Sequence, residues 1–397
     1  MMRRYYYLVT FLFFSIFSFG QDAIYTLLDH NPLGINPAYA LPSNCELQVS
    51  SNSRQQWWNL PGASSSASAY NLNQVSIIYP TITSLKGSGL GLGIQLNRNN
   101  SGEGNLAMTD VNFDIASNLQ INSGAIKQSI KVGVAVGIKQ YTLDWNQLTF
   151  SSQLDPYLGL VNPDPIVNPR IETSSLGMSR NFGFIYSNFI QKRSIFGNIY
   201  DISNSIGAAL FQANNTQISF FDQNAIIPQR ISIHGTIKLI PYNSRGLVSN
   251  IGGSYFLLRH NHHRQSSLRV NETRFGMNFM GSVTTYVGLR RRNFLIADET
   301  IDAVLWSAQI NLPGIMVSVG YDFTVSPLNI QRTRGTTEIG VTIPLGCQGN
   351  LGIKGRRASE PCYVDYLLKH AEWKAVEKFN NKSTDWGREY SPITFIL

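Results

Sequence analysis

The chain has 397 residues, of which 43% are hydrophobic and only 14% are charged. Soluble domains usually carry about a quarter charged residues, so this composition argues against an ordinary soluble domain. It suits a barrel that turns one apolar face to lipid and one small, polar face to its lumen. The net charge of +8 is spread along the chain without a basic helix that carries interleaved aromatics, which disfavours nucleic acid as a partner.

The first residues have the three parts of a signal peptide. Arg3 and Arg4 precede an apolar run, Tyr5–Phe19, and small residues then end at Gly20. The run is shorter than the roughly 20 residues of a spanning helix, so we expect residues 1–20 to be a cleaved signal peptide rather than an anchor. No later apolar stretch approaches that length, and a mature protein in the membrane would therefore have to span it as a closed barrel.

Residues 21–45 are expected to form a short periplasmic segment before the barrel. Two Asn-Pro pairs begin turns there, because proline fixes φ and asparagine bonds its own backbone. We expect the pairs to fold this segment compactly at the periplasmic mouth. The residues concerned are Asn31, Pro32, Asn36, Pro37, Ala38 and Tyr39.

Two residues just beyond this segment have expected structural roles. Arg54 is a candidate partner for a lumenal acid, with Asp322 and Glu338 as the candidates, and a structural ion pair is favoured over catalysis. Trp57 suits an interfacial aromatic girdle, where tryptophan anchors a protein in the membrane surface.

Residues 46–346 show the alternation of apolar and polar residues that is typical of two-sided strands. Residues 130–138, for example, place Ile130, Val132 and Val134 on one face and small or polar residues on the other. The strands are long, as membrane strands must be. We predict an all-β fold, a transmembrane antiparallel β-barrel of about 14 strands, with a strand number between 12 and 16. Polar residues expected to face its lumen are Asp110, Asp114, Lys131, His234, Lys238 and Arg290.

Two loops are candidate binding surfaces. The segment 146–172 contains four prolines and is expected to be irregular and exposed. His260, His262 and His263 lie between arginines, and a solvated basic loop is favoured over a metal site because no acid or cysteine completes a ligand set.

No catalytic constellation is found in the sequence. The sequence contains no GxSxG nucleophile elbow, no HExxH zinc motif and no Walker A phosphate loop. Asp110 and Asp114 share a strand face but would lie about 13 Å apart, too far for a carboxylate pair. The sequence therefore predicts a protein that is not an enzyme and that needs no cofactor or metal.

Residues 347–397 break the strand pattern. Residues 359–380 read as a helix with a charged surface, so we expect a small periplasmic tail. Cys347 and Cys362 could form a disulfide in an oxidising periplasm, and the third cysteine, Cys45, would then be unpaired.

Four motifs in a fixed order carry a resemblance to a known family. They are NPxxxNPAYA, which starts at Asn31, RxQW, a late Gly-Tyr-Asp stretch, and a closing glutamate strand. The residues beyond those of the first motif are Arg54, Gln56, Trp57, Gly320, Tyr321, Asp322 and Glu338. The order of the motifs resembles that of the PorP/SprF family, although Leu41 stands where the family usually has glycine.

The resemblance implies an outer-membrane component of the type IX secretion and gliding machinery. Such a protein would bind or anchor secreted cargo through the cargo's C-terminal sorting domain. Its partners would be outer-membrane lipid, the cargo, and other secretion components in the periplasm. The alternatives left open are a passive solute channel and a secreted β-sandwich adhesin.

Overall fold

The structure is a computed structural model. It describes residues 24–41, 47–57, 70–83, 88–102, 105–123, 126–144, 148, 150–155, 157–161, 171–195, 198–220, 223–241, 255–279, 282–293, 300–312, 314–326 and 330–345. The expected signal peptide, the tail helix and the Cys347–Cys362 disulfide lie outside the described residues.

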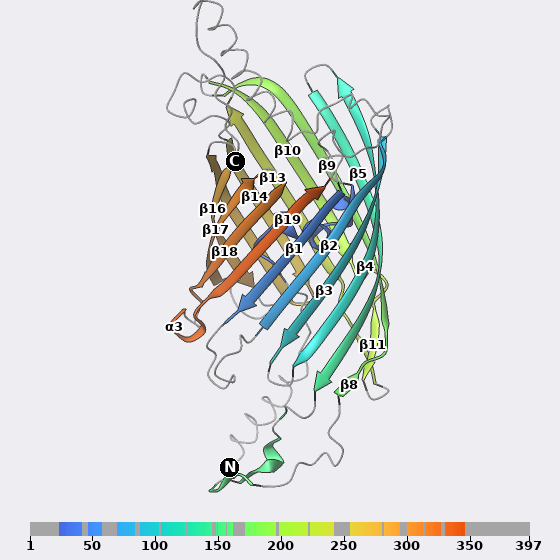
Figure 1. The fold of residues 1–397 in the computed structure, drawn as a ribbon, viewed down its shortest axis with the longest axis vertical. Helices are drawn as coiled ribbons and strands as arrows, with labels where there is room; N and C mark the ends of the chain where they lie inside the picture. Colours follow the sequence, from blue (N-terminus) through green and yellow to red (C-terminus); the bar gives the residue numbers. More distant parts are fainter. Residues whose placement is uncertain are drawn as a thin grey trace, which may run out of the picture.

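Fourteen antiparallel strands close into one barrel (Figure 1). Each strand pairs with two neighbours: β1 pairs with β19, and the long strands β4 and β5 complete the ring. The predicted fold and strand number are therefore confirmed. The strands are β1 (Leu47–Gln56), β2 (Tyr70–Thr83), β3 (Ser88–Ser101), β4 (Leu106–Ser123), β5 (Ile126–Asp144), β9 (Gly177–Ile195), β10 (Asn198–Phe211), β13 (Arg230–Pro241), β14 (Tyr255–Gln265), β15 (Leu268–Phe279), β16 (Val283–Asn293), β17 (Thr300–Leu312), β18 (Ile315–Thr324) and β19 (Thr336–Leu345).

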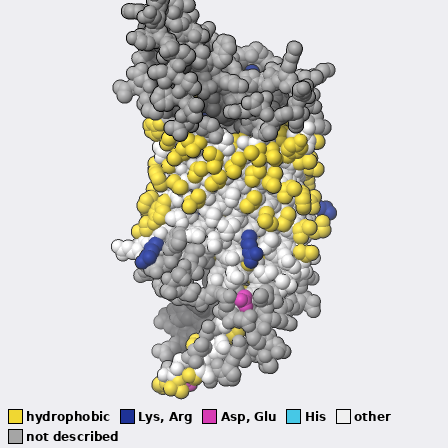
Figure 2. All heavy atoms as spheres, in the orientation of Figure 1, with side chains coloured by type: hydrophobic (Ala, Val, Ile, Leu, Met, Phe, Trp, Pro, Cys, Tyr) yellow, Lys and Arg dark blue, Asp and Glu magenta, His cyan; other side chains and the backbone are white. Residues whose placement is uncertain are grey.

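The outer wall carries a belt of exposed aliphatic side chains. On β5, Val132 and Val134 are about half exposed, while Ala135 between two outward valines is buried. Figure 2 shows hydrophobic side chains gathered in a band across the visible face of the described wall, with few of them on the wall below it. So large an apolar surface is unfavourable in water, and its natural solvent is the hydrocarbon of a bilayer. No helix among the described residues is long and apolar enough to cross a membrane.

The two ends of the barrel differ in their connections. At one end, the short-turn end, β1 begins and β19 finishes, and all but one of the connections have two to four residues. At the other end, the long-loop end, β5 and β9 are joined through residues 145–176, and β10 and β13 through residues 212–229. Outer-membrane barrels keep short turns in the periplasm and long loops outside the cell, so we assign the long-loop end to the cell exterior.

Short helices and strands lie in the loops of the long-loop end. Part of the expected loop 146–172 is ordered into η4 (Ser151–Gln153) and a hairpin of β6 (Leu154–Asp155) and β7 (Gly159–Leu160). The other pieces are β8 (Ile171–Thr173), β11 (Gln217–Phe220), β12 (Gln223–Ile226) and α3 (Ile330–Thr333).

The expected basic loop at His260–Arg264 is wrong, because these residues belong to β14 and pair on both sides. The sequence did not indicate a strand here because the outward side chains are polar. Beyond the apolar belt the outer wall does not face hydrocarbon, so its residues need not be apolar. His260 and His262 bond Thr273 and Asn271 of the neighbouring strand through Nδ1, at 2.8 and 2.6 Å.

The segment before β1 lies inside the barrel and not only at its mouth. It forms η1 (Leu28–His30), α2 (Pro32–Ile35) and η2 (Pro37–Ala40), drawn in dark blue within the wall of Figure 1. Thr26 contacts the wall near the long-loop end, and Leu41 contacts Lys131 toward the short-turn end. We call residues 24–41 the plug. The expected position at the periplasmic mouth is therefore corrected.

A charge on the belt is expected to weaken insertion. Val134→Arg places a guanidinium in the apolar belt and is predicted to lower the free energy of unfolding from lipid vesicles by about 2–4 kcal/mol. Denaturant titration of the refolded protein measures this, with Val134→Leu as the control. Equal stability of the two variants would show that residue 134 does not face hydrocarbon.

Candidate functional site

The plug is folded by its two Asn-Pro pairs. Oδ1 of Asn31 accepts a hydrogen bond from the backbone N–H of Gly34 (3.2 Å), and Oδ1 of Asn36 accepts one from Ala38 (2.9 Å). Each proline then stands at the first helical position, where its missing N–H costs nothing. The motif thus makes two capped turns in immediate succession.

The same asparagines also attach the plug to the wall. The amide nitrogen of Asn36 donates to the carbonyl oxygens of Phe184 (3.0 Å) and Ala208 (3.1 Å), and it lies 3.2 Å from Nε2 of His234. Gln95 donates to Oδ1 of Asn31 at 2.6 Å. The motif therefore specifies both the local turns and the place where the plug binds.

Glycines on the lumenal face make room for the plug backbone. A Cβ at Gly91 would overlap the carbonyl oxygen of Ala40, and a Cβ at Gly133 would overlap the backbone nitrogen of Ala38. A Cβ at Gly183 would meet the side chain of Asn36. The small lumenal face of these strands is thus the surface on which the plug rests.

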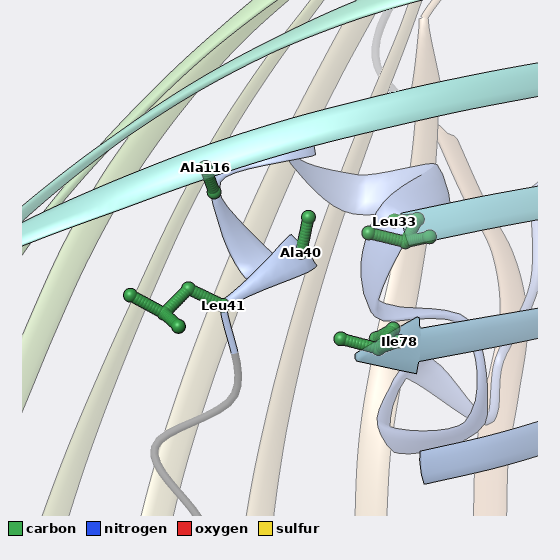
Figure 3. Close-up of a cluster of buried hydrophobic side chains, with 5 residues drawn as sticks. All are labelled: Leu33, Ala40, Leu41, Ile78 and Ala116. Atoms are coloured by element: carbon green, nitrogen blue, oxygen red, sulfur yellow. The ribbon is translucent and has the colours of Figure 1, made fainter. Parts of the chain in front are cut away.

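A small apolar cluster holds the end of the plug toward the short-turn end. Leu33, Ala40 and Leu41 of the plug pack with Ile78 and Ala116 of the wall, and all five side chains are buried (Figure 3). Burial of apolar surface contributes roughly 25 cal/mol per Å². Nζ of Lys131 reinforces this end by donating to the carbonyl oxygen of Leu41 at 3.0 Å.

The other end of the plug is held by buried charges that we call the ionic cluster. It contains three arginines and three carboxylates, so its formal charge is zero. Its side chains come from β15, β16, β18, β19 and β1, on one side of the barrel, and each residue is at most 4% exposed. The members are Arg54, Glu272, Arg274, Arg290, Asp322 and Glu338.

The pairs within the ionic cluster are close. Arg54 lies 2.8 Å from Asp322 and 2.9 Å from Glu338, so it meets both of its expected partners. Arg290 lies 2.7 Å from Asp322 and 3.1 Å from Glu272, which also contacts Arg274. Each carboxylate therefore has a guanidinium partner, as buried charges require.

Thr26 of the plug sits at the centre of the ionic cluster. Its hydroxyl accepts hydrogen bonds from Arg54 (2.7 Å) and Arg290 (2.8 Å) and lies 2.9 Å from an oxygen of Asp322. The carboxylate of Glu338 accepts the backbone N–H groups of Thr26 (2.7 Å) and Leu27 (2.8 Å). The ionic cluster is thus completed by backbone and side-chain groups of the plug.

Two ionisable plug residues make further contacts. Burial lowers the pKa of His30, so the ring is neutral at neutral pH, and it bonds Thr342 (2.7 Å) and Ser318 (2.6 Å). Burial raises the pKa of Asp29, but the guanidinium of Arg259, 2.8 Å away, more than offsets this and leaves the pKa below its usual range. Asp29 therefore stays ionised and attached to the wall.

The residues singled out from the sequence fall into two groups. Asn31 and Asn36 belong to the plug itself, and the wall residues that contact it are Arg54, Asp322, Glu338, Lys131, His234 and Arg290. A Cβ at Gly320 would meet Leu27 of the plug. Asp110 lines a polar cavity between the plug and the wall, a Cβ at Gly93 would meet both Asp114 and the plug residue Leu33, and the Lys238 ammonium lies over the ring of Tyr255. Gln56 and Trp57 lie at the end of β1, and the Tyr321 hydroxyl donates to the carbonyl oxygen of Arg334.

Thr26, His30, Glu272 and Arg274 were missed by sequence reasoning. Alternation on β15 puts Glu272 and Arg274 on one face, which was an available signal. Nothing local points to Thr26, because its partners are 28 to 312 residues away along the chain.

A small cavity adjoins the plug. Between the plug and strands β3–β5, a polar cavity of about 40 Å³ is lined by Gln95, Asp110 and Lys139, room for only a few water molecules. Among the described residues, no group of three or more His, Cys, Asp or Glu side chains is arranged to hold a metal ion. The arrangement suits closure of the lumen.

Removing one carboxylate of the ionic cluster should be costly. Glu338→Ala removes a carboxylate that accepts hydrogen bonds from Arg54, Asn52 and two plug N–H groups, and loss of one partner of a buried pair costs about 3–5 kcal/mol. Guanidinium-induced unfolding in micelles measures this. As a control, Arg292→Ala breaks a more exposed pair with Asp302 and should cost at most about 1 kcal/mol. Similar losses for both variants would mean that the ionic cluster does not hold the plug.

Comparison with known proteins places the chain in a family. The profile of the family described as type IX secretion system membrane protein PorP/SprF matches residues 17–343. No curated protein matches the chain.

Solved structures with some likeness to this one are distant. They include the β domain of the Bordetella autotransporter BrkA (9% identity, TM-score 0.32, 75% of this chain and 98% of that one). Others are the translocator domain of NalP from Neisseria meningitidis (6%, 0.33, 80% and 94%) and a FadL homologue of Pseudomonas aeruginosa (8%, 0.34, 78% and 93%). Since the family match spans most of the 397 residues, the chain belongs to the PorP/SprF family of type IX secretion system membrane proteins and is an outer-membrane β-barrel.

Proposed function

We propose that this protein binds a secreted cargo protein at the long-loop end of a plugged barrel, through the cargo's C-terminal sorting domain. Membership of a type IX secretion family supports a role in handling secreted proteins. The observation that carries the proposal is the plug, which lies inside the barrel and is bound to the wall at both of its ends. A barrel that is closed in this way offers its end surfaces, rather than its interior, to a partner.

The long-loop end carries an apolar tip suited to protein binding. Tyr157 is 95% exposed and Leu158 is 74% exposed at the turn between β6 and β7. The carboxylate of Asp155 accepts the backbone N–H groups of both residues, at 2.8 and 2.9 Å, which fixes the turn and holds the pKa of Asp155 below its usual range. Exposed aromatic and aliphatic side chains on an ordered turn are typical of interface anchors.

The plug ties together opposite sides of the barrel wall. Its residues bond β1, β18 and β19 on one side of the barrel and β5, β9 and β10 on the other. A pre-organised surface loses less conformational entropy on binding. We therefore assign the plug a supporting role in capture, and we place contacts with periplasmic secretion components at the short-turn end.

A passive solute channel is the alternative function. It requires an open path, and the plug counts against one. A large, steady current through the purified protein in planar bilayers would favour the channel. The secreted β-sandwich adhesin is overturned by the closed ring of strands.

Affinity purification from outer membranes tests the proposed function. The tagged wild-type protein should retain a large secreted protein that bears a C-terminal sorting domain. Tyr157→Ser combined with Leu158→Ser should lower recovery by about tenfold or more, since each anchor contributes on the order of 2 kcal/mol.

Val325→Ser is the matched control for that experiment, because Val325 is 52% exposed beyond the end of β18 and lies outside the hairpin. It should leave recovery unchanged. Absence of any sorting-domain protein from the wild-type eluate would contradict the proposal, and equal recovery with all variants would exclude the hairpin as the contact.

A further inference from the structure

Three neighbouring strands place arginines on the outer wall near the long-loop end. Arg264 of β14, Arg269 of β15 and Arg291 of β16 are all exposed. They alternate with buried lumenal neighbours such as His263 and Arg290, so their side chains lie on the outside of the barrel.

The register brings these positive charges together. Arg264 stands directly opposite Arg269, and Arg291 stands opposite Asn271, which is two residues from Arg269. Like charges directly opposite on paired strands destabilise a sheet. The arrangement therefore calls for a negative group that bridges them.

The described part of the chain does not supply that negative group. No carboxylate among the described residues lies within ion-pair distance of Arg264, Arg269 or Arg291. Among the described residues, the nearby acids have other partners: Glu272 faces the lumen and pairs with Arg290, and Asp302 pairs with Arg292.

The basic patch directly adjoins the lipid-facing belt. Leu289, 40% exposed, is the next outward residue after Arg291, about 7 Å along the strand. Phe275 and Val287, further along the same face, are 52% and 55% exposed. His260 and His262 add polar ring edges between the arginines and this belt. The patch thus lies where the headgroups of the outward leaflet meet the wall.

We propose that Arg264, Arg269 and Arg291 form a binding site for the phosphate groups of an anionic glycolipid in the outer leaflet. A guanidinium pairs with phosphate oxygens through two parallel hydrogen bonds. Continuity with the apolar belt identifies a lipid as the occupant, because acyl chains can cover the belt while the headgroup phosphate neutralises the arginines. The site is independent of cargo binding.

Binding of bisphosphorylated lipid A to the purified full-length protein in micelles tests this site, with native mass spectrometry as the readout. Arg264→Ala combined with Arg269→Ala should weaken binding by about 25-fold, since each basic residue at an anionic surface contributes about fivefold. Arg98→Ala is the control, because Arg98 is an exposed outward arginine that faces Asn73 and Thr109 instead of a second cation. This control should retain lipid A as the wild type does.

Three results would overturn the proposal. They are equal binding by the double variant and the wild type, equal binding of fully dephosphorylated lipid A, and displacement of lipid A by inorganic phosphate, which would indicate a free-anion site. Retention of an acidic protein instead of lipid, dependent on the same arginines, would also count against it. Weakened binding confined to the double variant and to the phosphorylated lipid is the expected result.

Discussion

Six charged side chains buried inside the barrel are the constraint on which the rest of the structure depends. Isolated charges in such a place would cost several kcal/mol each, and only close pairing with extra hydrogen bonds offsets that cost. Arg54, Asp322 and Glu338 have this pairing, but Glu338 also needs the backbone N–H groups of Thr26 and Leu27. The hydrogen bonds to Glu338 are therefore complete only when the plug is in place, and the wall and the plug specify each other.

The remainder of the lumen follows from this attachment. Once Thr26 is fixed, the two Asn-Pro turns carry the chain across the barrel to Leu41. Glycines line the wall where the plug passes, because a side chain at Gly91 or Gly133 would occupy the space of the plug backbone. The fit between plug and wall therefore places the plug across the lumen and ties the wall together. Binding partners are then expected at the ends of the molecule.

Much of the fold could be predicted from the sequence, because alternation is a local signal. The outward valines of β5 and the strand number were predicted in this way, and Asp322 and Glu338 were named as candidate partners of Arg54 because they were expected to face the lumen. The Asn-Pro pairs indicated turns correctly, since capping is local as well.

Other features depend on long-range register and could not be predicted. Thr26 meets Glu338 across most of the chain, and only closure of the barrel brings β15, β16, β18 and β19 around it. The strand around His260 was mistaken for a loop because it extends beyond the apolar belt, where outward residues can be polar. The plug was placed at the mouth because nothing local in Asn31–Ala40 reveals which surface receives it.

A disulfide between plug and wall tests the central claim most directly. A Cβ at Gly93 would lie 3.2 Å from the Cβ of Ala40, close to the about 3.5–4.5 Å of natural disulfides. With the native cysteines replaced by serine, Ala40→Cys combined with Gly93→Cys should oxidise in the folded barrel in native membranes. Ala40→Cys combined with Gly235→Cys should not, because a Cβ at Gly235 would meet, among the described residues, the carbonyl oxygen of Ser205 at 3.7 Å and no atom of the plug. Free thiols in both pairs, equally open to labelling, would contradict a plug seated inside the barrel.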